Sequence, residues 1–342
     1  MSEAMVAAQT LYYPFEAGLL PLPALGARGI VFNAQPGMRR PDGFRAELFL
    51  VQGFRPLFLP LQRSGHEIAP EPQGEGYNLA FVICGRHRRQ NELWIAVALA
   101  RTRPGGTILV AGGKTDGIAS LRKRAGDLLP LAGSASKHHG VVFWLERPVD
   151  EAQVASAVAA LTPAPALVEG RYQTAPGGFS ADKVDAGSRL LAESLPTDLK
   201  GKVADFCSGW GYLSVRLAER KAVSSVDLFE ADFASLVAAR QNLARLAPDL
   251  QTTFHWTDLA AEPIAARYDA IVMNPPFHQG RAAEPDIGLA MIRAAHAALK
   301  PGGRLFLVAN RGLPYEAELA RPFTKNGEIA RAGGFKVLWA QK

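Results

Sequence analysis

Asp205-Phe206-Cys207-Ser208-Gly209-Trp210-Gly211 is the stretch that decides the fold, because it joins an apolar run to a helical pattern through a turn with two glycines. The run Val203–Cys207 predicts a short buried strand, and the helix after the turn reaches about Arg220. Glycine permits such a tight turn and lets the backbone lie close to a bound cofactor. The dinucleotide-binding fingerprint needs a third glycine three residues later, where this chain has Ser214. The turn therefore favours a cofactor without phosphate over a dinucleotide.

Strands and helices alternate through the residues that follow this turn. The pattern predicts strands over Ser225–Phe229, Thr252–Trp256, Ala270–Met273 and Arg304–Ala309, helices over Phe233–Leu246 and Asp286–Leu299, and a hairpin over Glu328–Gln341. Such alternation predicts an α/β fold with a doubly wound, mostly parallel sheet. The terminal hairpin, which turns at Gly333-Gly334, adds an antiparallel edge strand.

A change in composition divides the chain into two parts. An alanine-rich helix is predicted from about Glu151 to Leu161, and Thr162-Pro163-Ala164-Pro165 follows it. Two prolines in three residues end a helix and stiffen a connection, so we expect one domain over residues 1–165 and a second over residues 166–342. A weak repeat spans this boundary: Tyr77–Val82 resembles Tyr268–Met273, and Arg103–Val110 resembles Lys300–Leu307. It predicts one fold used twice by duplication, although such strings also occur in unrelated sheets.

The composition excludes several classes of protein. With 342 residues, 48% hydrophobic and 20% charged, the chain is neither disordered nor too small for two cores. Cys84 and Cys207 alone cannot form a disulfide scaffold and fit a reducing compartment. No apolar run approaches the roughly 20 residues of a membrane span, and no basic segment precedes an apolar one at the N-terminus, so a cytoplasmic location is expected. The net charge of +6 permits a polyanionic partner without requiring one.

Two acidic residues stand at the ends of successive predicted strands. Glu230 ends the strand after the glycine turn, and its two carboxylate oxygens suit the two hydroxyls of a ribose. Asp258 follows the next strand and suits an adenine amino group. Either residue alone is also explained as a solvated loop carboxylate. Their order counts, because ligands of such sheets bind at the carboxyl ends of the strands.

The most specific feature is Asn274-Pro275-Pro276-Phe277, directly after a predicted strand. The prolines offer carbonyl oxygens but no N–H donors, and Asn274 adds a side-chain carbonyl. Such a turn presents acceptors to a planar NH₂ group, and Phe277 is placed to stack on the ring that bears it. The alternative is a rigid loop without chemistry, which the glycine turn and the acidic pair upstream disfavour.

Together these features resemble class I S-adenosylmethionine-dependent methyltransferases that modify an amino nitrogen. The longer string Asn274–Gly280 (NPPFHQG) is similar to the bacterial ribosomal RNA guanine-N2 methyltransferases, both the C-type enzymes of the small subunit and their G-type relatives of the large one. Three further strings carry the same resemblance: Pro176–Ser180, Asp185–Leu191 and Val308–Tyr315. The resemblance covers about residues 170–342.

The resemblance implies S-adenosyl-L-methionine as cofactor and direct in-line methylation of the exocyclic N2 amino group of a guanine in 16S ribosomal RNA. It also implies two tandem domains: a degenerate first copy, which recognises RNA, and a catalytic second copy with a seven-stranded sheet. The N-terminal half fits, since it has no D-x-x-x-G-x-G string, and Ile83-Cys84-Gly85-Arg86 stands where the repeat would place Asn274–Phe277. The chain length is closer to the small-subunit enzyme than to its usually longer relative.

The resemblance also assigns roles to particular residues. The catalytic residues would be Asn274, Pro275, Pro276 and Phe277. The cofactor-binding residues would be Asp205, Cys207, Gly209, Gly211, Glu230, Asp258 and Asn274. The substrate-binding residues would be Phe179, Phe277, His278, Arg311, Arg88 and Arg89. No metal is implied, and His278 is read either as an aid to proton release or as a loop histidine. This chain departs from the family's pattern at Phe206-Cys207-Ser208, at the bulky Trp210 and at the polar Asp227.

Basic clusters in the N-terminal half suggest where RNA is held. They are Arg86-His87-Arg88-Arg89, Arg122-Lys123-Arg124 and Lys137-His138-His139. Phosphate contacts of this kind orient a nucleic acid without reading its sequence, although such clusters are also common as solvated faces. The expected partner is ribosomal RNA or the small ribosomal subunit, without membrane or metal, and the expected oligomeric state is a monomer.

Other functions stay open at this point. A guanine-N2 methyltransferase of the large ribosomal subunit, an adenine methyltransferase acting on DNA and a glutamine methyltransferase acting on protein share parts of the pattern. A non-catalytic RNA-binding assembly factor on the same scaffold is a further alternative, which the intact Asn274–Phe277 turn disfavours. A nicotinamide-dependent oxidoreductase is disfavoured by Ser214 and has no use for the Pro-Pro turn.

Overall fold

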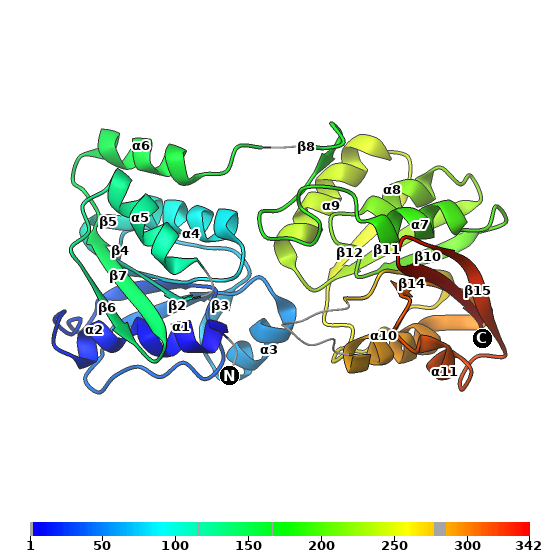
Figure 1. Cartoon of the computed structure of the whole chain (residues 1–342), viewed down its shortest axis with the longest axis horizontal. Coiled ribbons are helices and arrows are strands. Elements are labelled where there is room, and N and C mark those ends of the chain that lie inside the picture. Colours follow the sequence, from blue (N-terminus) through cyan, green and yellow to red (C-terminus); the bar gives the residue numbers. More distant parts are fainter. Residues whose placement is uncertain (1–2, 115–116, 166, 277–284) are drawn as a thin grey trace. The chain divides into compact units, whose positions relative to one another are not determined.

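A computed structural model of the chain describes residues 3–114, 117–165, 167–276 and 285–342. The chain separates into two compact units, Met1–Ala164 and Pro165–Lys342 (Figure 1). The division falls inside the proline-rich connection that the sequence singled out.

The first unit contains α1 (Glu3–Leu11), α2 (Tyr13–Glu16), β1 (Arg28–Phe32), β2 (Glu47–Val51), α3 (Arg55–Arg63), β3 (Glu67–Ala69), β4 (Tyr77–Ile83), α4 (Arg88–Arg101), β5 (Thr102–Gly113), α5 (Ile118–Leu128), β6 (Gly133–Lys137), β7 (Gly140–Glu146) and α6 (Glu151–Leu161). The second unit contains β8 (Leu167–Val168), β9 (Tyr172–Gln173), α7 (Ala186–Ser194), β10 (Gly201–Phe206), α8 (Tyr212–Ala218), β11 (Val223–Glu230), α9 (Phe233–Leu246), β12 (Gln251–Trp256), β13 (Tyr268–Met273), α10 (Pro285–Ala298), β14 (Leu299–Asn310), α11 (Tyr315–Leu319), β15 (Lys325–Ala332) and β16 (Phe335–Gln341).

Both units contain a seven-stranded sheet with the same strand order. The order is β3-β2-β1-β4-β5-β7-β6 in the first unit and β12-β11-β10-β13-β14-β16-β15 in the second. The first five strands of each order pair in parallel, whereas β7 and β16 run antiparallel to both of their neighbours. The fold is therefore a doubly wound α/β fold used twice, and the expectation of duplicated domains with a terminal antiparallel hairpin is confirmed.

Helices cover both faces of each sheet (Figure 1). In the second unit, one apolar core lies between the sheet and helices α7, α8 and α9, and another lies between the sheet and helices α10 and α11. The first unit has the same two layers, with α4, α5 and α6 on one face and α1 to α3 on the other. A parallel sheet covered on both sides directs ligands to the carboxyl ends of its strands.

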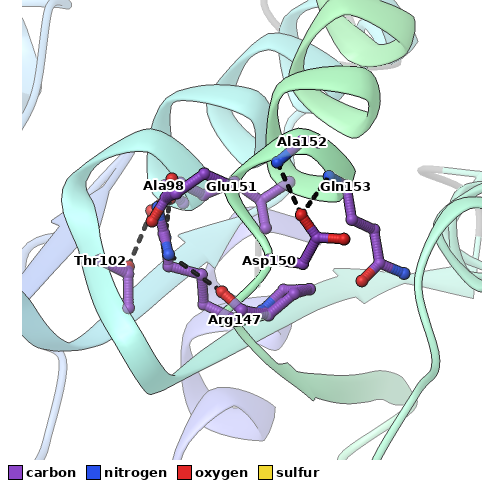
Figure 2. A network of polar contacts seen from close by, with 9 residues as sticks. Ala98, Thr102, Arg147, Asp150, Glu151, Ala152 and Gln153 are labelled. Atoms are coloured by element: carbon purple, nitrogen blue, oxygen red, sulfur yellow. Dashed lines mark hydrogen bonds and ion pairs between the residues drawn. The ribbon is translucent and has the colours of Figure 1, made fainter.

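The alanine-rich helix α6 is held by specific polar contacts (Figure 2). Asp150 caps its N-terminus and accepts from the backbone N–H of Ala152 at 2.9 Å. Arg147 is only 6% exposed. Its guanidinium donates to the backbone oxygen of Leu99 at 3.0 Å and to both carboxylate oxygens of Glu151 at 3.0 and 2.7 Å. One arginine thus joins the end of α4 to the start of α6.

Most expected elements are present in the second unit. The helix Phe233–Leu246 has the expected bounds, and the strands differ by one to a few residues. Helix α7 is an additional element of nine residues, which Asp185 caps. None of the helices that the structure describes is long and apolar enough to cross a membrane.

Candidate active site

The glycine turn leaves the carboxyl end of β10 in a left-handed backbone. Cys207 has φ 59°, Gly209 has φ 52° and Gly211 has φ 85°. The first value is uncommon for a residue with a side chain. Cys207 therefore adopts a backbone conformation that normally favours glycine. Burial raises the pKa of the Cys207 thiol well above its usual value. This shift disfavours the thiolate, which is the reactive form of cysteine.

The two glycines of the turn serve different purposes. A Cβ atom added to Gly209 would meet nothing within 4 Å, so this backbone lies open to a ligand. A Cβ atom at Gly211 would come within 2.9 Å of Leu243 and 3.2 Å of Ala239. Gly209 therefore combines a left-handed φ with an open surface, whereas Gly211 is required by its φ and by the packing of the turn on α9.

Asp205 is completely buried behind the turn. The Ser214 hydroxyl donates to its Oδ2 at 2.7 Å, and Oδ1 has no partner among the described residues. Burial raises the pKa of Asp205 to about 7, in spite of the Ser214 hydrogen bond. Ser214, read from the sequence as a missing glycine, thus supports the carboxyl group that sits under the turn.

Glu230 ends β11 beside the same turn. Its Oε2 accepts from the backbone N–H of Gly209 at 2.7 Å, and its Oε1 accepts from that of Asp232 at 2.9 Å. Burial raises the pKa of Glu230 to about 7, against these hydrogen bonds that favour the charged form. The carboxylate stands at the strand end where the sequence placed it. Asp258 follows β12 half-buried, and its side chain accepts from the backbone N–H of Ala260 at 3.0 Å.

Asn274 follows β13 at the neighbouring strand end and is 8% exposed. Its side-chain nitrogen donates to Asp185 Oδ2 at 2.9 Å and to Ser188 Oγ at 2.8 Å. Its buried Oδ1 has no hydrogen-bond partner among the described residues. A buried acceptor without a donor is costly, so this oxygen has the chemistry to accept a hydrogen bond from a ligand's N–H group.

A pocket that is partly open to solvent contains this amide. Its lining residues are Phe179, Ser180, Asp185, Ser188, Cys207, Ser208, Gly209, Trp210, Tyr212, Leu213 and Asn274. The Ser208 hydroxyl is a second buried polar atom of the pocket without a described partner. Phe179 is 57% exposed, and its backbone oxygen accepts from the Trp210 indole at 3.2 Å. The bulky Trp210 therefore holds the segment that carries Phe179.

Other candidate residues lie elsewhere or outside the description. Phe277 and His278 lie outside the described residues. Arg311 is exposed beyond the end of β14, and its backbone N–H donates to Gly334 at 2.9 Å. Arg88 and Arg89 begin α4 in the first unit, where Arg88 pairs with Glu92 at 2.8 Å. Among the described residues, no group of three or more His, Cys, Asp or Glu side chains is arranged to hold a metal ion.

Three residues that build the site were not picked out from the sequence. Asp185 and Ser188 hold the Asn274 amide, and their only sequence signal was the string Asp185–Leu191. Asn242 is completely buried on α9 and donates to the backbone oxygens of Trp210 and Gln173, both at 2.8 Å. No sequence pattern distinguished it from the apolar face of its helix.

The same strand ends are closed in the first unit. The pairings Phe32↔Val82 and Phe206↔Met273 show that Asn33, with φ 56°, occupies the position in the first unit that Cys207 occupies in the second. By the same register, Gln35 stands for Gly209, Gln52 for Glu230 and Ile83 for Asn274. The Gln35 amide donates to the backbone oxygen of Asn33 at 2.9 Å, and the Gln52 amide donates to that of Ala34 at 2.7 Å. At this strand end the first unit therefore has two buried glutamines bonded to its own backbone, where the second unit has Gly209 and Glu230.

Comparison with known proteins finds a matching family model and similar sequences. The family model of the methyltransferase small domain matches residues 169–339. A ribosomal RNA small subunit methyltransferase C of Erwinia tasmaniensis is 31% identical over 261 residues, which are 71% of this chain and 70% of that protein. One of Salmonella arizonae is 32% identical over 243 residues, 68% of this chain and 66% of that protein.

A solved structure is similar over both units. It is the 16S rRNA N2 G1207 methyltransferase of T. thermophilus in complex with AdoMet and guanosine, which is 28% identical with a TM-score of 0.78. The match covers 97% of this chain and 91% of that one.

Proposed function

The chain belongs to the ribosomal RNA small subunit methyltransferase C family, and on this premise we propose that it methylates the exocyclic N2 of a guanine in 16S ribosomal RNA, with S-adenosyl-L-methionine as methyl donor. The observation that carries the proposal is the buried, unpartnered Oδ1 of Asn274 in the pocket beside Gly209. An amino group is the donor that such an acceptor fits.

The residues beside the turn fit the cofactor. The open backbone at Gly209 leaves room for its close approach, and the Glu230 carboxylate suits the ribose hydroxyls. Asp258 would face the adenine, as its place after the next strand suggests. Asp205, completely buried, would support the turn from behind rather than touch the cofactor. Cys207 and Gly211 would contribute through the shape of the turn.

The chain's own part in the reaction is to orient an amine and stabilise its developing charge. When bound, S-adenosylmethionine supplies an electrophilic methyl group on a sulfonium. The guanine amine is a weak nucleophile because its lone pair is delocalised into the ring. Hydrogen bonds from this amine to Asn274 Oδ1 and to the Pro275 carbonyl favour a pyramidal nitrogen and gain strength as positive charge develops there. Pro276 keeps the turn rigid and free of competing donors.

Substrate binding requires a base outside a duplex, because a stacked base cannot enter such a pocket. Phe277 and the exposed Phe179 are proposed as walls that stack on it, each contact worth about 1–3 kcal/mol. His278 and Arg311 are proposed to face the substrate, and Arg88 and Arg89 of the first unit to hold RNA phosphates. We further propose that the small ribosomal subunit is the natural partner, that the enzyme acts as a monomer and that it works in the cytoplasm.

Mapping of methylated guanines by mass spectrometry tests this function. Ribosomal RNA from cells without the protein should lack one N2-methylguanine in 16S RNA, and the purified protein should restore it. An unchanged 16S RNA with a lost 23S modification would move the substrate to the large ribosomal subunit. If no RNA is methylated although S-adenosylmethionine binds, the assembly-factor alternative is favoured.

Substitution of Asn274 tests the role of its amide. We expect Asn274→Ala to reduce methyl transfer by roughly 10²–10³-fold, as for removal of one preorganised group in other active sites. Affinity for S-adenosylmethionine should change little, because Asn274 Oδ1 is assigned to the substrate amine. Near-normal turnover in this variant would refute the assignment.

A further inference from the structure

The orientation of the Asn274 amide is fixed by its neighbours. Asp185 Oδ2 lies 2.9 Å and Ser188 Oγ lies 2.8 Å from the side-chain nitrogen of Asn274. An ionised carboxylate only accepts hydrogen bonds, so the amide nitrogen must face Asp185. The opposite flip would place Oδ1 against the carboxylate and lose that bond.

We propose that Asp185 and Ser188 are positioning residues for methyl transfer, which rests on the proposed function of Asn274. By accepting both amide protons, they hold Oδ1 toward the pocket. Their acceptor atoms also polarise the two N–H bonds and raise the electron density on the amide nitrogen. Amide resonance passes this density on to Oδ1, because hydrogen bonds in a chain polarise one another. The oxygen becomes a stronger acceptor for an amine that is acquiring positive charge.

The first turn of α7 makes this pair rigid. Asp185 is the N-cap residue, and the same Oδ2 that faces Asn274 accepts from the backbone N–H of Ser188 at 2.7 Å. Gly187 leaves the space that this carboxylate occupies. A Cβ atom there would lie 3.0 Å from Asp185 Oδ2 and 3.0 Å from the Phe335 ring. A helix terminus braced against β16 thus orients an amide at the end of β13.

Asp185→Asn separates this role from helix capping, because Asn caps a helix about as well as Asp. The amide that replaces the carboxylate can donate as well as accept. Both orientations of the Asn274 amide can then form a hydrogen bond, so the amide is free to flip. We expect kcat to fall by roughly 10- to 100-fold, less than the loss of a whole preorganised group. The KM for RNA, the affinity for S-adenosylmethionine and the melting temperature should stay near their wild-type values. Ser188→Ala should give a smaller loss in the same direction.

Asp150→Asn is the matched control, because Asp150 caps α6 in the first unit with the same chemistry. It should leave kcat unchanged. Wild-type kcat in Asp185→Asn overturns the proposal, and so does a fall in kcat matched by weaker cofactor binding and lower stability, which indicates a purely structural role.

A measurement without turnover keeps this test apart from that of the function. With ¹⁵N-labelled asparagine, the Asn274 signal is identified by its loss in Asn274→Ala. Its side-chain amide protons should exchange slowly in the wild type and at least tenfold faster in Asp185→Asn. Equal exchange in both proteins overturns the positioning role, whatever RNA the enzyme methylates. Absence of methylation by the wild type with the expected difference in exchange would instead refute only the function.

Discussion

Cofactor affinity should depend on pH through Glu230. Burial raises the pKa of this carboxyl to about 7 in the ligand-free chain. The ribose hydroxyls donate hydrogen bonds, so they need the ionised form as acceptor. About one tenth of Glu230 is ionised at pH 6 and about nine tenths at pH 8, since one pKa unit corresponds to a factor of ten. The dissociation constant should therefore be about tenfold lower at pH 8 than at pH 6.

Calorimetric titration with 5′-methylthioadenosine measures this effect, because that ligand keeps the adenosine but has no amino-acid part that titrates in this range. At pH 6, binding should release close to one proton, which is seen by comparing buffers of different ionisation heat. Glu230→Gln should bind roughly 10- to 100-fold more weakly, as expected for loss of hydrogen bonds to a charged group, and without the pH dependence.

Two results would refute this reasoning. A wild-type dissociation constant that stays constant from pH 6 to 8 would show that Glu230 is ionised throughout or does not touch the ligand. A pH dependence retained in Glu230→Gln would assign that dependence to Asp205, whose pKa burial also raises to about 7.

The pH dependence that Glu230 gives to folding stability has the opposite sign to the one that it gives to cofactor affinity. Because the folded pKa of Glu230 is raised from 4.5 to about 7, its stabilising contribution is complete below about pH 4.5 and lost as the pH rises through 7.

Three further outcomes are expected. Cys207→Gly should keep the free energy of unfolding within about 1 kcal/mol of wild type, whereas Cys207→Val should lower it by about 2 kcal/mol, because a β-branched side chain fits a left-handed backbone poorly; equal denaturant midpoints would contradict this. Arg147→Ala should destabilise the first unit by about 1–3 kcal/mol, since the Leu99 oxygen loses its buried donor, and unchanged thermal unfolding would count against it. Reversal of Arg88 and Arg89 to Glu should weaken RNA binding and flatten its salt dependence, so equal salt slopes in a filter-binding assay would remove these residues from the RNA contact.

The sequence allowed the strand and helix layout to be predicted because it repeats simple patterns. Apolar runs of strand length alternate with helical spacing, and Gly and Pro separate them. The ends of β10, β11 and β13 could therefore be located, and with them Cys207, Glu230 and Asn274. Asp227, a departure from the family's pattern, is explained only in three dimensions: it is buried, accepts from the Tyr268 hydroxyl at 2.7 Å and pairs with Lys202 at 2.9 Å.

The contacts that orient the site could not be predicted in this way. Asp185 lies 89 residues before Asn274, and Asn242 lies 32 residues after Trp210. Such pairs depend on how elements pack across the sheet, and spacing along the chain carries no signal of it. Ser214 shows the same limit. Its hydrogen bond to Asp205 is visible only in the structure, whereas the sequence shows only that glycine is absent at this position.

The amide contacts of the first unit limit how its strand ends could be opened to a ligand. Gln35 and Gln52 are buried, and each amide is satisfied by backbone at or next to Asn33. Replacing Gln52 by Glu alone would turn a carboxylate toward the Ala34 oxygen in place of a donor, and replacing Gln35 by Gly alone would leave a cavity. Each of these substitutions alone would destabilise the first unit, so opening this strand end to a ligand would require both changes together.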